Sequence, residues 1–223
     1  INTPGGSVAA SQEIADMIRN FKKPIVISMG DTAASGGYYI SAPADGIVAQ
    51  PGTMTGSIGV IMTTFNTEEL MKKIGVERTI IKSGEHKDMF QGGLEPEEKE
   101  ILQKISNEAY SQFVGEVAQG RNLSKNEVKE LATGQIYTGS QAQKAGLVDK
   151  LGGIEEAVNL VSSIGNIKNP VKYEYPPPGI LQRMQGMVYQ VSAYIKSSWL
   201  PQKLMIWRDL KNNSSYKLRY QLK

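Results

Sequence analysis

The sequence predicts an α/β protein built of parallel strands and helices, and three observations support this fold class. Short apolar runs alternate with segments in which apolar residues recur at helical spacing. Glycine-containing turns separate these segments. The run at 24–29 is almost continuously apolar, which is typical of a strand buried on both faces. A length of 223 residues allows one full domain plus an appendage.

The elements can be predicted in chain order. Ser7 or Ser11 can cap a first helix that runs to about Phe21. Strands are expected at 24–29, 46–49, 58–62 and 79–82, and further helices at 67–74, 96–120, 124–131, 140–145 and 154–163. The long helix opens with Glu95, Glu97 and Glu98, where negative charge suits a helix N-terminus.

The Pro176-Pro177-Pro178 run predicts a boundary between a domain at 1–178 and a C-terminal extension at 179–223. The extension carries a net charge of +7 and both tryptophans, whereas the preceding 178 residues carry a net charge of −4. Residues 186–195 are apolar on one face, which predicts a helix that lies at a membrane surface or packs at a subunit interface.

The chain opens on Ile1 and a Pro4-Gly5-Gly6 turn, the kind of turn that follows a strand. We therefore expect Ile1 to be the stub of a strand, the domain to be incomplete at its N-terminus, and any membrane anchor to lie upstream. No run in the sequence reaches the ~18 apolar residues that a membrane-spanning helix needs.

Composition excludes several classes of chemistry. The sequence has no cysteine, which excludes disulfides, zinc–thiolate sites and thiol catalysis. A single histidine, His86, excludes a two-histidine metal site. Nucleic-acid binding is not expected, because the first 178 residues are acidic and contain no recognised binding motif.

The segment at 30–39, Gly-Asp-Thr-Ala-Ala-Ser-Gly-Gly-Tyr-Tyr, directly follows the strand predicted at 24–29. A serine at a strand-to-helix junction lies beside the first unpaired N–H groups of the helix, and small neighbours let another backbone approach. Ser35 is therefore a candidate nucleophile. The segment is not a G-x-S-x-G elbow, so Ser35 could equally be a capping residue in a tight turn.

A serine nucleophile needs a base, and the residues alone leave two alternatives. His86 could form a Ser-His-Asp triad with Asp88 or Asp45. Lys87 could act instead, because a buried, unpaired ammonium loses its proton more readily. Both side chains are also common in solvated polar loops.

Two glycine-rich segments could complete such a site. Backbone N–H groups after Pro4 and after Ser35 could converge on a developing oxyanion. In the segment at 56–59, Ser57 could hydrogen-bond a neutral lysine or serve as the nucleophile itself, and both segments could also be plain turns.

Taken in order, these motifs resemble the signal peptide peptidase A family of serine proteases, relatives in fold of Clp protease and crotonase. The matching segments are 2–6, 28–42, 55–60 and 81–88, with a weaker likeness at 137–152. The resemblance covers roughly the first 160 residues. It implies an α/β fold of the Clp protease/crotonase type, here followed by a helical C-terminal extension.

The resemblance also implies roles for individual residues. It aligns Ser35 with the family's nucleophile and Lys87, 52 residues later, with the general base. It aligns Ser57 with the serine that orients the lysine, and it assigns the oxyanion hole to the N–H groups of Gly6 and Gly36. Ser7 stands where the family pattern has a third glycine.

The implied function is a serine endopeptidase with a Ser-Lys dyad that needs no cofactor. The resemblance implies a membrane-associated oligomer that degrades signal peptides after they have been cleaved from their proteins. The expected partners are therefore peptide substrates, a membrane surface and further copies of the chain. The catalytic domain is expected on the extracytoplasmic side of the cell membrane. Two alternatives are an oligomeric membrane-associated scaffold without turnover and a crotonase-like acyl-CoA enzyme.

Overall fold

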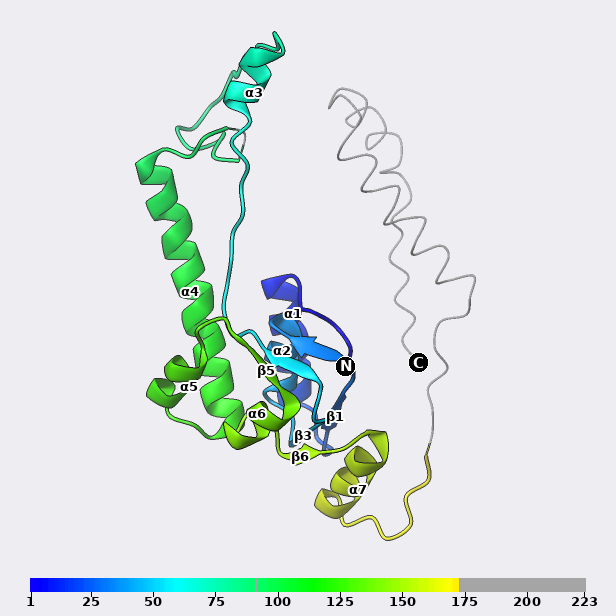
Figure 1. Ribbon diagram of the computed structural model, residues 1–223. Coiled ribbons are helices and arrows are strands. Elements are labelled where there is room, and N and C mark those ends of the chain that lie inside the picture. Colours follow the sequence, from blue (N-terminus) through cyan, green and yellow to red (C-terminus); the bar gives the residue numbers. More distant parts are fainter. Residues whose placement is uncertain (91, 173–223) are drawn as a thin grey trace, which may run out of the picture. The chain divides into compact units, whose positions relative to one another are not determined.

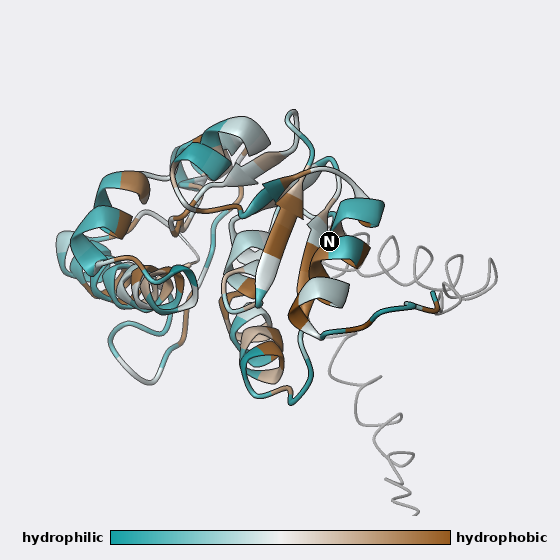
Figure 2. Cartoon of the chain, turned by 90° about the horizontal axis from the view of Figure 1, so that it is seen from below, coloured by the Kyte–Doolittle hydropathy of each residue, from teal (hydrophilic) through white to brown (hydrophobic). Residues whose placement is uncertain are grey.

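Two small sheets form the centre of the fold in the computed structural model, which describes residues 1–90 and 92–172. The first sheet is wholly parallel, in the order β1 (Val26–Met29), β3 (Gly46–Ala49), β6 (Lys150–Leu151). In the second, β4 (Met54–Gly56) lies parallel to β2 (Thr32–Ala34) and antiparallel to β5 (Ile136–Thr138). Figure 2 shows apolar residues concentrated on the central strands.

The N-terminal residues hydrogen-bond as strand residues do. Gly30 N donates to Ile1 O at 2.7 Å, and Thr3 forms a parallel bridge with Ala33 beside β2. Residues 1–6 form this isolated bridge and no assigned strand, so the expectation that Ile1 is the stub of a strand stays a prediction. The pairing brings the Pro4-Gly5-Gly6 turn to the C-terminal end of β2, where α2 begins.

Seven helices occur in the described residues: α1 (Val8–Arg19), α2 (Gly36–Ser41), α3 (Glu68–Lys73), α4 (Pro96–Arg121), α5 (Lys125–Leu131), α6 (Gly139–Lys144) and α7 (Ile154–Ile164). The six predicted helices are confirmed within about two residues at each end. The interpretation of Ser11 as a cap is wrong, because Ser7 is the N-cap residue of α1 and Ser11 lies inside the helix.

The core forms where the sheets meet α2, the second half of α4 and the segment after α6. Its fully buried side chains include Tyr38, Ile47, Ile58 and Leu147. The Tyr38 hydroxyl donates to Leu147 O at 2.9 Å, and burial raises the pKa of this tyrosine. A hydrogen bond inside the core thus fixes α2, which begins directly after Ser35, to the segment that follows α6.

Helix α4 reaches beyond the core. Its 26 residues span about 39 Å, and Glu95 and Glu98 form a capping box at its start. Phe113 and most of its other buried residues lie in the second half, which packs near α2. The first half extends away from the sheets.

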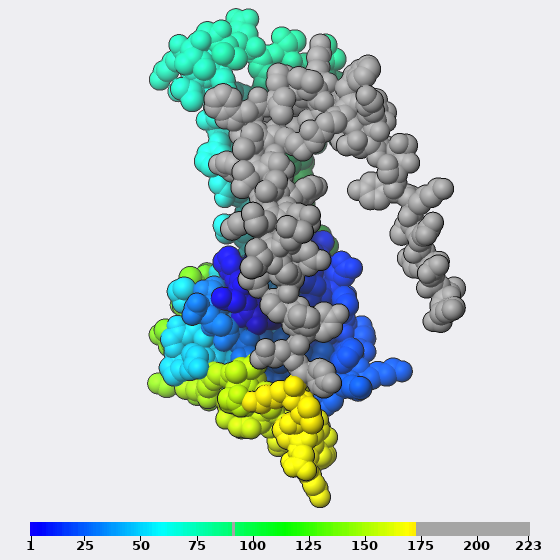
Figure 3. All heavy atoms as spheres, turned by 90° about the vertical axis from the view of Figure 1, so that its right-hand side faces the viewer, coloured from blue at the N-terminus to red at the C-terminus, as the bar shows by residue number. Residues whose placement is uncertain are grey.

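Residues 60–90 and 92–95 belong to an arm that runs out to the start of α4 and includes α3. Figures 1 and 3 both show α3 and the teal residues that follow it standing clear of the sheets. The strands predicted at 58–62 and 79–82 are wrong, since neither segment forms a strand. Ile61, Phe65 and Ile81 in this arm are 89%, 81% and 96% exposed.

No helix in the described ranges, 1–90 and 92–172, is long and apolar enough to cross a membrane. The compact unit that holds the sheets ends at Pro170, and a second unit begins at Val171. The boundary predicted at Pro178, the helix predicted at 186–195 and the basic extension all lie outside the described residues.

Candidate active site

Ser35 lies between β2 and α2 with a backbone conformation that is rare for a residue with a side chain. Its φ is 52° and its ψ is −121°, whereas φ above zero is normally left to glycine, asparagine or aspartate. Its N–H donates to Gly56 O at 2.8 Å, and its carbonyl accepts from Tyr39 N at 2.9 Å, which fixes the turn on both sides. Strained backbone of this kind concentrates at functional sites.

The expectation that Ser35 directly follows the strand at 24–29 needs a correction. The chain turns at Gly30 and forms the three-residue strand β2 before it reaches Ser35. Ala34, the last residue of β2, pairs in parallel with Gly56, and this pairing fixes the position of Ser35 at the end of the sheet. The strand-to-helix junction predicted from the sequence is therefore present, but the strand is β2.

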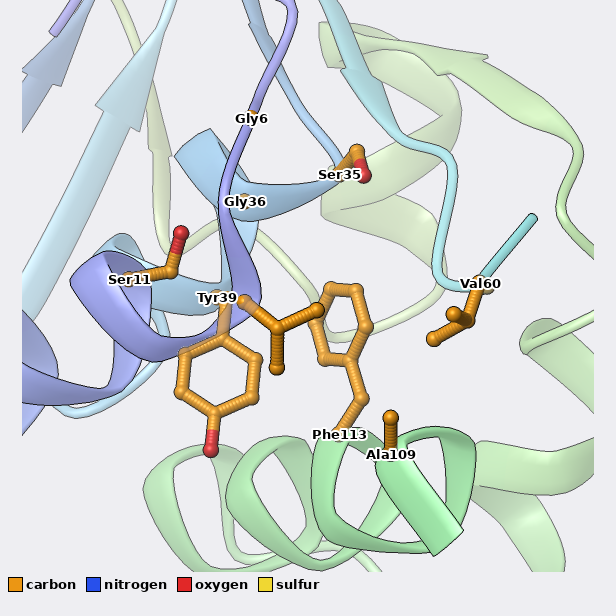
Figure 4. Close-up of a pocket in the computed structure, with 10 residues that line it drawn as sticks. Gly6, Ser11, Ser35, Gly36, Tyr39, Val60, Ala109 and Phe113 are labelled. Atoms are coloured by element: carbon orange, nitrogen blue, oxygen red, sulfur yellow. The ribbon is translucent and has the colours of Figure 1, made fainter. Parts of the chain in front are cut away.

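The Pro4-Gly5-Gly6 turn lies against the start of α2. Gly5 has a φ of +112°, and a methyl group added to it would lie 2.7 Å from Gly36 N, so only glycine fits there. A methyl group added to Gly36 would lie 3.2 Å from Gly6 N. Figure 4 shows Gly6 and Gly36 on adjacent backbone segments beside Ser35.

The two predicted oxyanion donors are available for a ligand. Within residues 1–90 and 92–172, neither Gly6 N nor Gly36 N donates a hydrogen bond. Gly36 is the first residue of α2, where the N–H has no partner inside the helix. Both glycines and Ser35 line the same pocket.

Ser57, like Ser35, has a positive φ. Its φ is 50°, and its N–H donates to Gln135 O at 2.8 Å. Both serines border one open groove of about 510 Å³, whose other lining residues are Pro4, Gly6, Val8, Gly59, Val60, Ile61, Tyr110, Ala132, Thr133 and Gly134. Four of the five residues singled out by the sequence thus meet around one groove and the pocket beside it.

The pocket is small and mostly apolar. It holds about 30 Å³ and is lined by side chains that include Val8, Tyr39, Val60, Ala109 and Phe113. Figure 4 shows the Tyr39 and Phe113 rings on one side of the pocket and Val60 on the other, and the two ring centroids lie 5.0 Å apart. Such a space fits a small apolar side chain.

Ser11 also lines the pocket, and sequence reasoning did not place it there. Its hydroxyl donates to Ser7 O at 2.9 Å inside α1. The same oxygen would lie 2.6 Å from a methyl group added at Gly36. No motif signalled this contact, because it depends on how α1 packs on α2.

Lys87 is not brought to Ser35 within one chain. Its side chain is exposed, and it lines neither the pocket nor the groove that Ser35 borders. Lys87 N donates to Gly84 O in a turn that follows α3 along the arm. Figure 1 shows this part of the arm at the opposite end of α4 from α2.

The histidine alternative finds less support. His86 lies in the same turn, and its ring nitrogens lie 4.0 Å from Glu97 and 3.9 Å from Glu98. Asp45 accepts a hydrogen bond from Ile25 N, far along the chain from that turn. Asp88 pairs with Lys82 instead of with His86.

The arrangement has the parts that acyl transfer requires, apart from the base. A hydroxyl stands at a strained junction, two free amide donors lie beside it, and an apolar pocket adjoins them. Among the described residues, no group of three or more histidine, aspartate or glutamate side chains lies placed to hold a metal ion.

Residues 18–168 match the family model described as peptidase family S49. A Synechocystis relative with the name "Putative protease" is 40% identical over 96% of this chain and 80% of its own length. The Enterococcus faecium "Putative signal peptide peptidase SppA" is 40% identical over 96% of this chain and 60% of its own length. "Protease 4" of Salmonella typhi is 35% identical over 87% of this chain and 32% of its own length. The chain thus spans less than two thirds of the length of each of the last two relatives.

A solved structure of a variant of the 1510-N membrane-bound stomatin-specific protease is also similar. It superposes with a TM-score of 0.53 at 20% identity, over 79% of this chain and 80% of that chain. At this identity the likeness concerns the fold alone. The predicted fold class, an α/β fold of the Clp protease type, is confirmed.

Proposed function

Because the chain belongs to peptidase family S49 and is a serine protease, we propose that Ser35 is its nucleophile and Lys87 its general base. The proposed substrates are cleaved signal peptides and similar hydrophobic peptides at the membrane. The observation that carries the proposal is the strained Ser35 turn, which stands beside the free N–H groups of Gly6 and Gly36.

The chemistry follows from these groups. The neutral Lys87 amine takes the hydroxyl proton as Ser35 attacks a peptide carbonyl, and the two glycine N–H groups stabilise the tetrahedral oxyanion. Lys87 then protonates the leaving amine, and water hydrolyses the acyl-enzyme. Ser57, on the same groove, orients the lysine.

We propose that Lys87 reaches Ser35 from a second copy of the chain. A general base must come within about 3 Å of the oxygen whose proton it accepts, or reach it through one water. Within one chain the turn that carries Lys87 lies on the projecting arm, so it does not meet this condition. The exposed apolar side chains of that arm, Ile61, Phe65 and Ile81 among them, support this assembly, since burial against another copy would remove them from water. The same contact would desolvate the ammonium and favour its neutral form.

The pocket supports a substrate preference. Val8, Tyr39, Val60 and Phe113 make it apolar, and Ala109 on α4 contributes only a methyl group to its wall. A volume of about 30 Å³ favours alanine or a residue of similar size next to the cleaved bond. Action at a membrane surface is part of the proposal, supported by the basic, tryptophan-containing sequence after residue 178. The extracytoplasmic side is proposed on the resemblance to the signal peptide peptidase A family alone.

The proposal is tested by reacting the protein with a fluorophosphonate and locating the adduct by mass spectrometry. We expect one modified residue, Ser35, and loss of labelling after prior reaction with a peptide aldehyde that ends in alanine. An adduct only on Ser57, or none under conditions where the protein hydrolyses peptides, would refute the assignment of the nucleophile.

Gly36→Ala should slow catalysis without unfolding the protein. The added methyl group would lie 2.6 Å from Ser11 Oγ and 3.2 Å from Gly6 N, so the two oxyanion donors must move apart. We expect kcat to fall by about 100-fold or more with a smaller change in KM. Hydrolysis of a fluorogenic peptide measures both.

Two further variants control this prediction. Gly52→Ala should behave as wild type, because an added methyl group there meets no atom within 4 Å. Ser11→Ala combined with Gly36→Ala should recover part of the loss, since it removes the closest obstacle. A Gly36→Ala protein with wild-type kcat would show that these donors do not set the rate.

A further inference from the structure

The turn that carries Lys87 is held by another lysine. Lys82 Nζ donates to Glu85 O at 2.7 Å and lies 2.7 Å from Asp88 Oδ1. Lys87 N donates to Gly84 O at 3.3 Å within the same turn. One ammonium thus bridges the backbone before Lys87 and the carboxylate directly after it.

Asp88 is the carboxylate adjacent to Lys87 in the chain, and it is already paired. Its side chain is 22% exposed, against 40% for Lys82. The hydrogen bond from Lys82 is the main cause that lowers the pKa of Asp88, and the charge of Arg78 contributes less. In the described part of the chain, Lys87 itself forms no ion pair.

The choice of partner for Asp88 matters because of what a general base needs. A carboxylate beside an ammonium stabilises the charged form and raises the pKa of the amine, whereas a second cation nearby lowers it. The charged groups around the turn are Arg78, Lys82, Glu85, His86, Asp88, Glu97 and Glu98, of which the last two face His86. Among these groups, His86 and Asp88 adjoin Lys87 in the chain, and Asp88 is the carboxylate of the two. We therefore take its pairing with Lys82 as the contact that matters for Lys87.

We propose that Lys82 is a positioning residue for the reaction: it holds the Asp88 carboxylate away from Lys87 and so lets Lys87 lose its proton near neutral pH. This inference rests on the proposed function, in which Lys87 is the base. It adds that the turn contains two lysines with different roles: Lys82 is paired with a carboxylate, whereas Lys87 forms no ion pair with the residues that the structure describes.

The test measures the rate at which a fluorophosphonate labels Ser35 between pH 5 and 10. Four forms of the full chain are compared: wild type, Lys82→Met, Asp88→Asn and the double variant. In Lys82→Met the freed Asp88 carboxylate should pair with Lys87. The acidic limb of the pH–rate profile, where the rate rises with pH, should then shift to higher pH by about one unit, so that labelling at a given pH on this limb is about tenfold slower. The plateau at high pH should be retained. Asp88→Asn should leave the acidic limb at the wild-type pH or slightly below it. The double variant, Lys82→Met with Asp88→Asn, should also have its acidic limb near the wild-type pH.

Each contrary result has a distinct meaning. An unshifted limb in Lys82→Met, a loss of rate that is the same at every pH, or an equal upward shift in Asp88→Asn would overturn the inference, because each indicates a merely structural role for the pair. Lys104→Met, which removes an exposed lysine on α4, is the matched control and should leave the profile unchanged. If Lys87→Ala still labels at the wild-type rate, the proposed dyad itself fails, whatever Lys82→Met does.

Discussion

Ser35→Ala is expected to abolish peptide hydrolysis, with kcat reduced by about 10⁴- to 10⁶-fold. The substitution removes the oxygen that forms the acyl-enzyme, while the oxyanion donors and the pocket remain and leave a small residual rate. Steady-state hydrolysis of a fluorogenic peptide and fluorophosphonate labelling both measure the effect. The fold should persist, because Ser35 makes its hydrogen bonds to Gly56 and Tyr39 through backbone atoms that alanine retains.

Two serine controls make this result specific. Ser111→Ala on α4 removes a hydroxyl that donates to Asn107 O within its own helix, and it should leave kcat unchanged. Ser57→Ala should slow the reaction yet keep the label on Ser35. If Ser35→Ala retains activity and the label moves to Ser57, then Ser57 is the nucleophile, the alternative that the sequence left open.

Lys87→Ala is expected to lower kcat by about 10²- to 10⁴-fold, the usual contribution of a general base. Lys87→Arg should not rescue the loss, because a guanidinium stays protonated throughout the working pH range. The same peptide assay measures both variants, and circular dichroism checks that each is folded. Wild-type kcat in Lys87→Ala would exclude Lys87 as the base.

Helices were the part of the fold that the sequence predicted best. The apolar spacing of α1 and α7 and the acidic start of α4 are local signals, and each corresponds to a helix within about two residues. The buried strands β1 and β3 were found for the same reason, since a short apolar run between turns is visible without knowledge of its partner.

The strands β2, β4, β5 and β6 were missed because none of them has more than three residues. Thr32–Ala34 has the small side chains of a turn, and it is a strand because it pairs with Thr3 on one side and with β4 on the other.

The segments at 58–62 and 79–82 were predicted as strands but form none. These segments have strand-like composition, but a strand also needs a partner for its backbone groups, and within the described chain they form no ladder.

The site was predictable as far as it depends on local backbone. Ser35, Ser57, Gly6 and Gly36 lie in short segments whose glycines and small residues are visible in the sequence. The fold brings these segments to one groove and the pocket beside it. Contacts set by packing were not predictable, such as Ser11 against Gly36. The position of Lys87 belongs to this second kind, because it depends on where the arm docks.

The most direct test of the central claim, a Ser-Lys dyad shared between copies, is to produce the inactive Ser35→Ala and Lys87→Ala chains separately and together. If Ser35 of one copy works with Lys87 of another, random co-assembly of equal amounts should restore about a quarter of the wild-type activity, since a quarter of the sites then contain both groups. A co-produced mixture that assembles normally yet is as inactive as either variant alone would contradict the account.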